Sequence, residues 1–152
     1  MEKKKLGQWM LLAVVCLSFS VGEIYAQKHE FADFKRYAKE NATLAQPVKK
    51  EKRVVFMGNS ITEGWVRTHP DFFKTNGYIG RGISGQTSYQ FLLRFREDVI
   101  NLAPALVVIN AGTNDVAENT GPYNEDYTFG NIASMAELAK ANKIKVILTS
   151  VL

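Results

Sequence analysis

Residues 53–64 read RVVFMGNSITEG, and this stretch decides the fold class. The branched apolar run from Val54 to Phe56 is typical of a buried strand, and Gly58 allows a tight turn from that strand into a helix. Ser60 would then lie at the N-terminus of the helix, where an α/β protein can present a nucleophile. The stretch therefore predicts a strand, a sharp turn and a helix that begins with an accessible serine.

The rest of the chain alternates between two apolar patterns. Short runs rich in branched residues predict further buried strands at residues 78–83, 105–111 and 145–152. Apolar residues at helical spacing predict amphipathic helices over residues 30–45, 88–102 and 131–142. Pro47 and Pro104 are expected to end the first two helices. This alternation predicts an α/β fold with a mostly parallel sheet.

The first segment has the pattern of a secretory signal peptide. Three lysines precede an apolar run over residues 9–21, and Ala26 provides a small residue for cleavage. The run is shorter than the about 20 residues of a membrane-spanning helix, so no stable membrane anchor is expected, and an uncleaved anchor is the disfavoured alternative. We therefore expect residues 1–26 to be removed, residues 27–152 to form one domain, and the protein to be periplasmic or secreted.

Charge and cysteine content exclude several classes of function. The formal net charge of +4 falls to +3 without residues 1–26, which is too small to predict nucleic-acid binding. Cys16, the one cysteine in the sequence, lies in the expected signal peptide, so the mature chain could form neither a disulfide nor a cysteine-based metal site. Paired histidines and acidic clusters are also missing from the sequence. We expect no metal and no other cofactor.

Three loops follow the carboxyl ends of three consecutive predicted strands, where open α/β sheets place their ligand sites. They contain the motifs GNSIT at residues 58–62, GISGQT at 82–87 and AGTND at 111–115. With these motifs in this order, residues 53–152 resemble the SGNH, or GDSL, hydrolase family. The resemblance implies a three-layer, doubly wound, mostly parallel sheet of the flavodoxin-like type.

The resemblance also implies roles for three residues. In the family the serine of the first motif is the nucleophile, which corresponds to Ser60. The glycine of the second motif and the asparagine of the third, here Gly85 and Asn114, complete an oxyanion hole with the N–H of the serine. The chemistry agrees, because glycine offers an unobstructed N–H and a neutral amide donates at any pH. The implied substrates are small-molecule esters, either O-acetylated carbohydrates or small lipid and lysophospholipid esters.

The general base of the family comes from an Asp-x-x-His motif near its C-terminus, and no histidine follows His69 in this sequence. His69 has Val66 instead of an aspartate three residues before it, so we do not expect it to be catalytic. A catalytic role is even less expected for His29, which lies beside the cleavage site. We therefore expect a C-terminally truncated hydrolase domain that is nearly inactive by itself. Its last strand is expected to be an exposed apolar edge that promotes aggregation.

Other residues near the motifs leave alternatives open. Asn59 stands where the family has an aspartate, which we expect to be tolerated while it leaves the substrate in doubt. Asp115 is interpreted as a loop-capping acid in preference to a substrate ligand, and Thr87 with Ser88 as a helix cap. Trp65 could pack on a sugar ring, but a core position is favoured.

Substrate choice is expected to depend on two loops. One follows Ser60 and includes Trp65, Phe72 and Phe73, and the other spans residues 116–129.

Two rival functions remain. Residues 80–85, GRGISG, satisfy the G-x-G-x-x-G pattern of dinucleotide binding. However, they do not follow the first predicted strand, and no acidic residue lies at the end of a strand about 20 residues later. The stronger rival is an exported carbohydrate- or lipid-binding protein that keeps the fold without catalysis. A Ser60→Ala substitution separates the two classes, because an esterase would lose turnover while a binding protein would lose nothing.

Overall fold

A computed structural model describes residues 31–48 and 51–150 of the chain. The expected signal peptide with Cys16, as well as His29 and the last two residues of the final predicted strand, lie outside the described residues. The chain divides into two units, residues 1–33 and 34–152, and the elements discussed below all belong to the second. In the described part of the chain, no helix is long and apolar enough to cross a membrane.

Four parallel strands form the centre of the fold. They are β1 (Val54–Gly58), β2 (Tyr78–Gly82), β3 (Leu106–Asn110) and β4 (Lys145–Leu148), in the sheet order β2-β1-β3-β4. The pairing aligns Val54 with Tyr78 on one side and with Leu106 on the other, so the carboxyl ends of the three strands are level. The parallel α/β fold expected from the sequence is confirmed.

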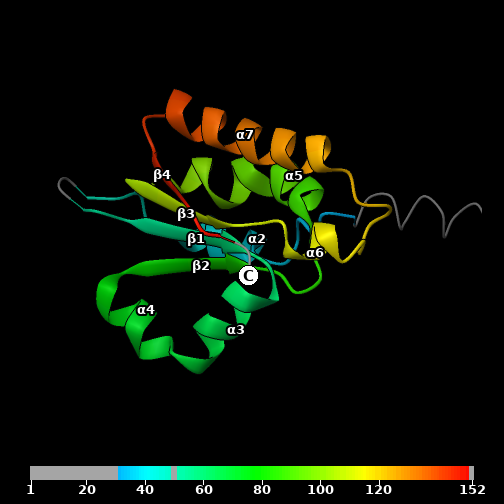
Figure 1. The fold of residues 1–152 in the computed structure, drawn as a ribbon. Coiled ribbons are helices and arrows are strands. Elements are labelled where there is room, and N and C mark those ends of the chain that lie inside the picture. Colours follow the sequence, from blue (N-terminus) through cyan, green and yellow to red (C-terminus); the bar gives the residue numbers. More distant parts are fainter. Residues whose placement is uncertain (1–30, 49–50, 151–152) are drawn as a thin grey trace, which may run out of the picture. The chain divides into compact units, whose positions relative to one another are not determined.

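Helices cover both faces of the sheet (Figure 1). They are α2 (Ala38–Thr43), α3 (Ser60–Thr68), α4 (Pro70–Asn76), α5 (Ser88–Asp98), the 3-10 turn η1 (Ile100–Leu102), α6 (Thr113–Val116) and α7 (Glu125–Ala141). Figure 1 shows α5 and α7 over one face and α3 with α4 over the other, which gives three layers. The short helix α6 follows the carboxyl end of β3.

The core lies between the sheet and the layer of α5 and α7. Alternate strand residues point to this face and are fully buried: Val55, Met57, Val107 and Ile109. Each of the two helices packs against them with residues four apart, which are Phe91 and Phe95 on α5 and Met135 and Ala139 on α7. Each large side chain buried in this way stabilises the fold by about 1.5–3 kcal/mol.

The opposite face of the sheet carries an aromatic cluster. Phe56 of β1 lies with its ring centroid 5.4 Å from Trp65 of α3 and 5.3 Å from Phe73 of α4. Phe72 stacks on Trp65 at 5.3 Å. Trp65 and the two phenylalanines lie on helices and not in the expected loop. Trp65 packs in this cluster but is 38% exposed, so it is not a core residue.

The prediction of an N-terminal helix over residues 30–45 is wrong in its bounds. Residues 34–37 form turns, and α2 begins at Ala38, ends at Thr43 well before Pro47, and buries no residue. Polar contacts hold this segment instead of an apolar stripe. Asn41 donates to Asp98 Oδ1 at 2.7 Å and accepts from both Arg81 Nε and Nη2, at 2.9 and 2.7 Å.

Other helix boundaries also differ from the prediction. The regular part of α5 ends at Asp98 and is followed by η1, so Pro104 does not end it directly. The last helix, α7, begins at Glu125 instead of residue 131, because the Asn124 side chain accepts from Tyr127 N at 3.0 Å and caps it. Phe129 therefore lies on a helix and not in the second expected loop. Helices α4 and α6 were not predicted.

Strand β4 lies at the edge of the described sheet. It pairs with β3, and Ile147 and Leu148 are 49% and 53% exposed. The described part of the chain thus presents the exposed apolar edge that the sequence predicts.

Candidate active site

The three sequence motifs begin where β1, β2 and β3 end. Pairing sets Gly58 opposite both Gly82 and Asn110, so the chain leaves the three strands at the same end of the sheet. This end, formed by the carboxyl ends of the strands, is called the carboxyl edge. The first turn of α3 presses on two of these strand ends. A side chain at Gly58 would come within 2.1 Å of Thr62 Oγ1, and one at Gly82 within 2.4 Å of the Glu63 nitrogen. Glycine at both positions therefore lets the helix approach the edge of the sheet.

Ser60 is the first residue of α3 and is exposed. Asn59 before it is buried and caps the helix, since its side-chain oxygen accepts from Ile61 N at 3.0 Å. The asparagine thus performs a local capping function that needs no negative charge. The partial positive charge of the helix N-terminus lies next to Ser60, which favours negative charge developing there. Within the described residues, no hydrogen bond engages the Ser60 hydroxyl.

Gly85 lies in an exposed loop at φ +80°, a conformation that favours glycine. The loop is tightened by a bond from Gln86 N to Ile83 O at 3.3 Å, and Asn119 Nδ2 donates to the Gly85 carbonyl at 3.1 Å. In the described part of the chain, no acceptor takes the Gly85 N–H. That N–H is therefore available to a ligand.

Asn114 joins the third motif to the second. It lies in α6, and its Nδ2 donates to the Gln86 carbonyl at 2.9 Å. A carboxamide nitrogen carries two protons, so one remains for a second acceptor.

Asp115 is buried and connects the third motif to the helices α5 and α7. Its carboxylate accepts from Ser88 N at 3.0 Å, from Ser88 Oγ at 2.5 Å and from Thr128 Oγ1 at 3.4 Å. Because Ser88 begins α5 and Thr128 lies in the first turn of α7, one carboxylate holds the starts of both helices. The interpretation of Asp115 as a capping acid is confirmed. Thr87 is the N-cap of α5, as expected, and its N–H donates to Gln90 Oε1 at 2.9 Å.

Arg94 is a fully buried cation that the sequence analysis did not identify. Its guanidinium donates to Gln86 Oε1 and to Asp98 Oδ2, both at 2.6 Å. It also donates to the carbonyls of Gly58 at 3.2 Å and Arg81 at 2.9 Å. Arg94 therefore ties the ends of β1 and β2 to the second motif. The available signal was its position at helical spacing from Phe91, on the apolar side of the predicted helix.

Tyr37 supports the same edge from the segment before α2. Its hydroxyl donates to the Gly82 carbonyl, and burial raises the pKa of Tyr37 above its ordinary value. The hydroxyl therefore stays protonated and able to donate at neutral pH.

His69 does not belong to this site. It is exposed at the junction of α3 and α4, where its Nδ1 lies 2.8 Å from Thr68 Oγ1. His69 follows Ser60 by nine positions at the far end of α3, a rise of about 13 Å along the helix. The structure therefore agrees that His69 is not the base for Ser60.

The pattern of dinucleotide binding fails in the structure. Gly80 and Gly82 are residues of β2 itself, so they form no phosphate-binding turn after a strand. The described residues also contain no group of three or more histidine, cysteine, aspartate or glutamate side chains that could hold a metal ion.

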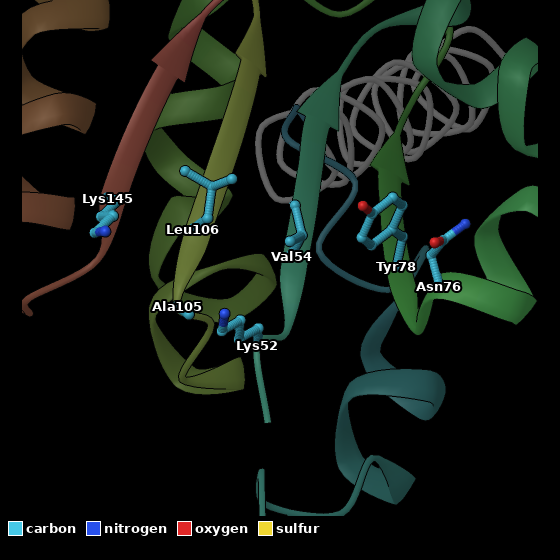
Figure 2. A pocket seen from close by; sticks show the side chains of 7 residues that line it. All are labelled: Lys52, Val54, Asn76, Tyr78, Ala105, Leu106 and Lys145. Carbon is cyan, nitrogen blue, oxygen red and sulfur yellow. The ribbon is translucent and has the colours of Figure 1, made fainter. Parts of the chain in front are cut away.

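A pocket of about 490 Å³ lies at the opposite end of the sheet, where the strands begin, which is called the amino edge. Figure 2 shows that its side chains come from the beginnings of the strands, among them Val54, Tyr78 and Leu106, with Lys52 and Lys145 beside them. None of the three motifs contributes to it. The candidate active site is therefore the carboxyl edge, where the motifs are.

Comparisons with known proteins cover the part of the chain that contains the three motifs. The family model of the GDSL-like Lipase/Acylhydrolase family matches residues 56–152. The esterase TesA of Pseudomonas aeruginosa is 33% identical over 99 residues, which are 62% of this chain and 48% of that protein.

Solved structures agree. A GDSL-like lipase of Bacteroides thetaiotaomicron is 94% identical with a TM-score of 0.80, over 81% of this chain and 60% of its own. An acetyl xylan esterase is 28% identical with a TM-score of 0.54, over 63% of this chain and 56% of its own. The chain thus spans about half of the curated relative and 60% of the solved lipase. Because the family match takes in more than half of the chain, this protein belongs to the GDSL-like lipase/acylhydrolase family of ester hydrolases.

Proposed function

We propose that the full-length protein is a serine esterase that forms an acyl-enzyme at Ser60. The observation that carries the proposal is the 2.9 Å hydrogen bond from Asn114 Nδ2 to the Gln86 carbonyl. It joins the second and third motifs at the edge of the sheet where α3 begins with Ser60. Family membership supports the same reaction class.

The reaction begins when Ser60 Oγ attacks the carbonyl carbon of the ester and a general base takes its proton. The carbonyl electrons move onto the oxygen, which accepts from Ser60 N–H, Gly85 N–H and Asn114 Nδ2–H. Collapse of this intermediate breaks the bond to the alcohol oxygen, and the protonated base returns its proton to that oxygen. Water then attacks the acyl-enzyme in the same way and releases the acid. Each preorganised oxyanion donor of this kind is worth about 10²–10³ in rate.

The base is proposed to lie in the part of the full-length protein that this chain does not span. A serine hydroxyl without a base is a weak nucleophile at neutral pH. Residues 1–152 alone are therefore expected to turn over esters about 10⁶-fold more slowly than the full-length protein.

O-acetylated carbohydrates are the proposed substrate class. Support comes from the 28% identity to an acetyl xylan esterase and from the expected export of the protein, which would bring it to polymers outside the cell. Small lipid and lysophospholipid esters are the competing substrates. Export itself is tested by a mature N-terminus at Gln27 in the periplasmic or secreted protein.

The test uses full-length protein with acetylated xylan, p-nitrophenyl acetate and a lysophospholipid as substrates. Ser60→Ala is compared with Ser134→Ala, a serine on α7 whose hydroxyl donates to Gly130 O at 2.8 Å. We expect release of acetate, a loss of about 10⁶ in kcat for Ser60→Ala, and wild-type turnover for Ser134→Ala. Binding of xylan without turnover by the wild-type protein would contradict the proposal and favour a carbohydrate-binding protein.

A further inference from the structure

The carboxylate of Glu63 bridges two elements of the site. Its Oε2 accepts from Ser84 N at 2.9 Å and from Ser84 Oγ at 2.5 Å. Its Oε1 accepts from Arg36 Nη2 at 3.0 Å. Ser84 immediately precedes Gly85, so both hydrogen bonds act on the loop that carries the available N–H.

Glu63 is fixed relative to Ser60. It lies three residues further along α3, which places both on neighbouring positions of the helix surface. The Glu63 backbone N–H donates to Asn59 O at 3.0 Å within the first turn of the helix. This turn also packs directly on Gly82. A group held by the Glu63 carboxylate is therefore held at a set distance from the serine.

The loop needs such a hold on its Ser84 side. Ser84 and Gly85 are both exposed, so packing constrains them little. The far side of the loop is already held, because the Gln86 carbonyl accepts from Asn114 and the Gln86 side chain accepts from Arg94. The two bonds from Ser84 to Glu63 supply the restraint on the near side.

The charge of Glu63 is balanced locally. Hydrogen bonds from Ser84, with support from Arg36, hold the pKa of Glu63 below its ordinary value, so the carboxylate is ionised at neutral pH. Charge-assisted bonds of this kind are roughly twice as strong as neutral ones. The Arg36 guanidinium offsets a negative charge that would otherwise oppose an oxyanion nearby.

We propose that Glu63 is a positioning residue for the oxyanion hole, which ties the loop bearing Gly85 to the helix bearing Ser60. This role rests on the proposed esterase function. Glu63 itself touches no reacting atom and acts through Ser84. Because a misplacement of about 1 Å can cost on the order of 10² in rate, loss of this tie is expected to lower kcat.

The experiment compares Glu63→Ala and Glu63→Gln with Glu40→Ala in the full-length protein. Glu40, Glu63 and Ser84 all line one surface hollow. Glu40 is exposed, and removing it also deletes one negative charge but leaves the bonds to Ser84 in place. We expect kcat for p-nitrophenyl acetate to fall about 10- to 100-fold in Glu63→Ala with KM nearly unchanged. Glu63→Gln is expected to recover most of the loss, because its amide oxygen still accepts from Ser84. Glu40→Ala is expected to match the wild type.

A second measurement does not depend on turnover. The Ser84 amide donates a hydrogen bond to the Glu63 carboxylate. Its hydrogen exchange is expected to be faster in Glu63→Ala and unchanged in Glu40→Ala. Wild-type kcat in Glu63→Ala, with Ser60→Ala inactive, would overturn the positioning role and leave the esterase proposal standing. Wild-type turnover in Ser60→Ala would overturn the esterase proposal and, with it, the role assigned to Glu63. Unchanged Ser84 exchange in Glu63→Ala would refute the tie itself.

Discussion

The two edges of the sheet differ in what their polar groups do. At the carboxyl edge, buried Arg94 donates to the carbonyls of Gly58 and Arg81 at 3.2 and 2.9 Å and to the Gln86 side chain at 2.6 Å. Buried Asp115 accepts from the Ser88 N–H at 3.0 Å. At the amino edge, the pocket of about 490 Å³ is lined by apolar strand residues and by the lysines Lys52 and Lys145 (Figure 2). The carboxyl edge thus holds orientated donors and acceptors, whereas none of the three motifs lines the pocket at the amino edge.

This difference teaches that volume alone is a poor guide to an active site. Ester hydrolysis needs a nucleophile and donors held where the oxyanion will form, because groups already in place need no reorganisation during the reaction. The carboxyl edge supplies Ser60 and the Asn114 amide on such a framework. The following predictions test whether the chemistry belongs to that edge.

Among the framework and donor residues, the largest effect is expected from Asn114→Ala in the full-length protein. Loss of one oxyanion donor should lower kcat by about 10²–10³ with little change in KM. Asn76→Ala is the matched control, since Asn76 is an amide at the amino edge whose Nδ2 donates to Phe72 O. Steady-state kinetics on p-nitrophenyl acetate measure both. Equal losses in the two variants would remove the distinction between the edges.

Asp115→Ala is expected to weaken the framework of the carboxyl edge. The substitution leaves the buried Ser88 N–H and hydroxyl without the acceptor that Asp115 provides, so the free energy of unfolding should fall by about 1–3 kcal/mol. Asp126→Ala, an exposed acid in the first turn of α7, serves as the control. Urea unfolding followed by circular dichroism measures the difference. A fall of the same size for Asp126→Ala would mean that loss of an acid, not of the buried network, is responsible.

A smaller effect is expected from the pH dependence of Glu63. Its folded-state pKa is lowered, chiefly by the Ser84 hydroxyl, so its contribution to stability is present above the unfolded pKa of about 4.3. That contribution is lost as the pH falls through the lower folded-state pKa. The stability difference between wild type and Glu63→Gln should therefore be constant near neutral pH and shrink below about pH 4.3. A difference that grows on acidification would contradict the ionised tie.

The smallest effect is expected at the amino edge. Lys145→Ala removes a cation from the pocket but touches none of the three motifs. Its kcat and KM should equal those of the wild type, and its stability should change by no more than about 0.5 kcal/mol. A clear loss of turnover in this variant would extend the functional site to the opposite edge.

The sequence predicted the strands well because their pattern is local. The branched runs at β1 and β3 and the three motifs that follow strands specify the parallel sheet and the edge where the motifs meet. Helix starts were harder to predict. The start of α7 is set by the polar cap at Asn124 and not by the apolar spacing that predicts the helix. Helix α2 depends on the long-range contacts of Asn41, which no local spacing encodes.

The candidate site was predicted only in part for the same reason. Ser60, Gly85 and Asn114 could be named from motifs, and their roles remain predictions. Glu63 could not be identified in this way, because its importance comes from Ser84, which is 21 residues distant in sequence. Helical spacing from Phe91 indicates that Arg94 is buried, but it does not predict the bond to Gly58, which is 36 residues distant. Such contacts follow from the fold and not from any pattern within one helix.

The central claim, that Ser60 is the nucleophile of this edge, is tested most directly by covalent labelling. Full-length protein would be treated with a fluorophosphonate, which traps an activated serine as a stable tetrahedral adduct, and then digested for mass spectrometry. We predict a single adduct on the peptide that contains Ser60, formed much more slowly in Asn114→Ala. An adduct on a different serine, or rapid labelling that persists in Ser60→Ala, would contradict the account.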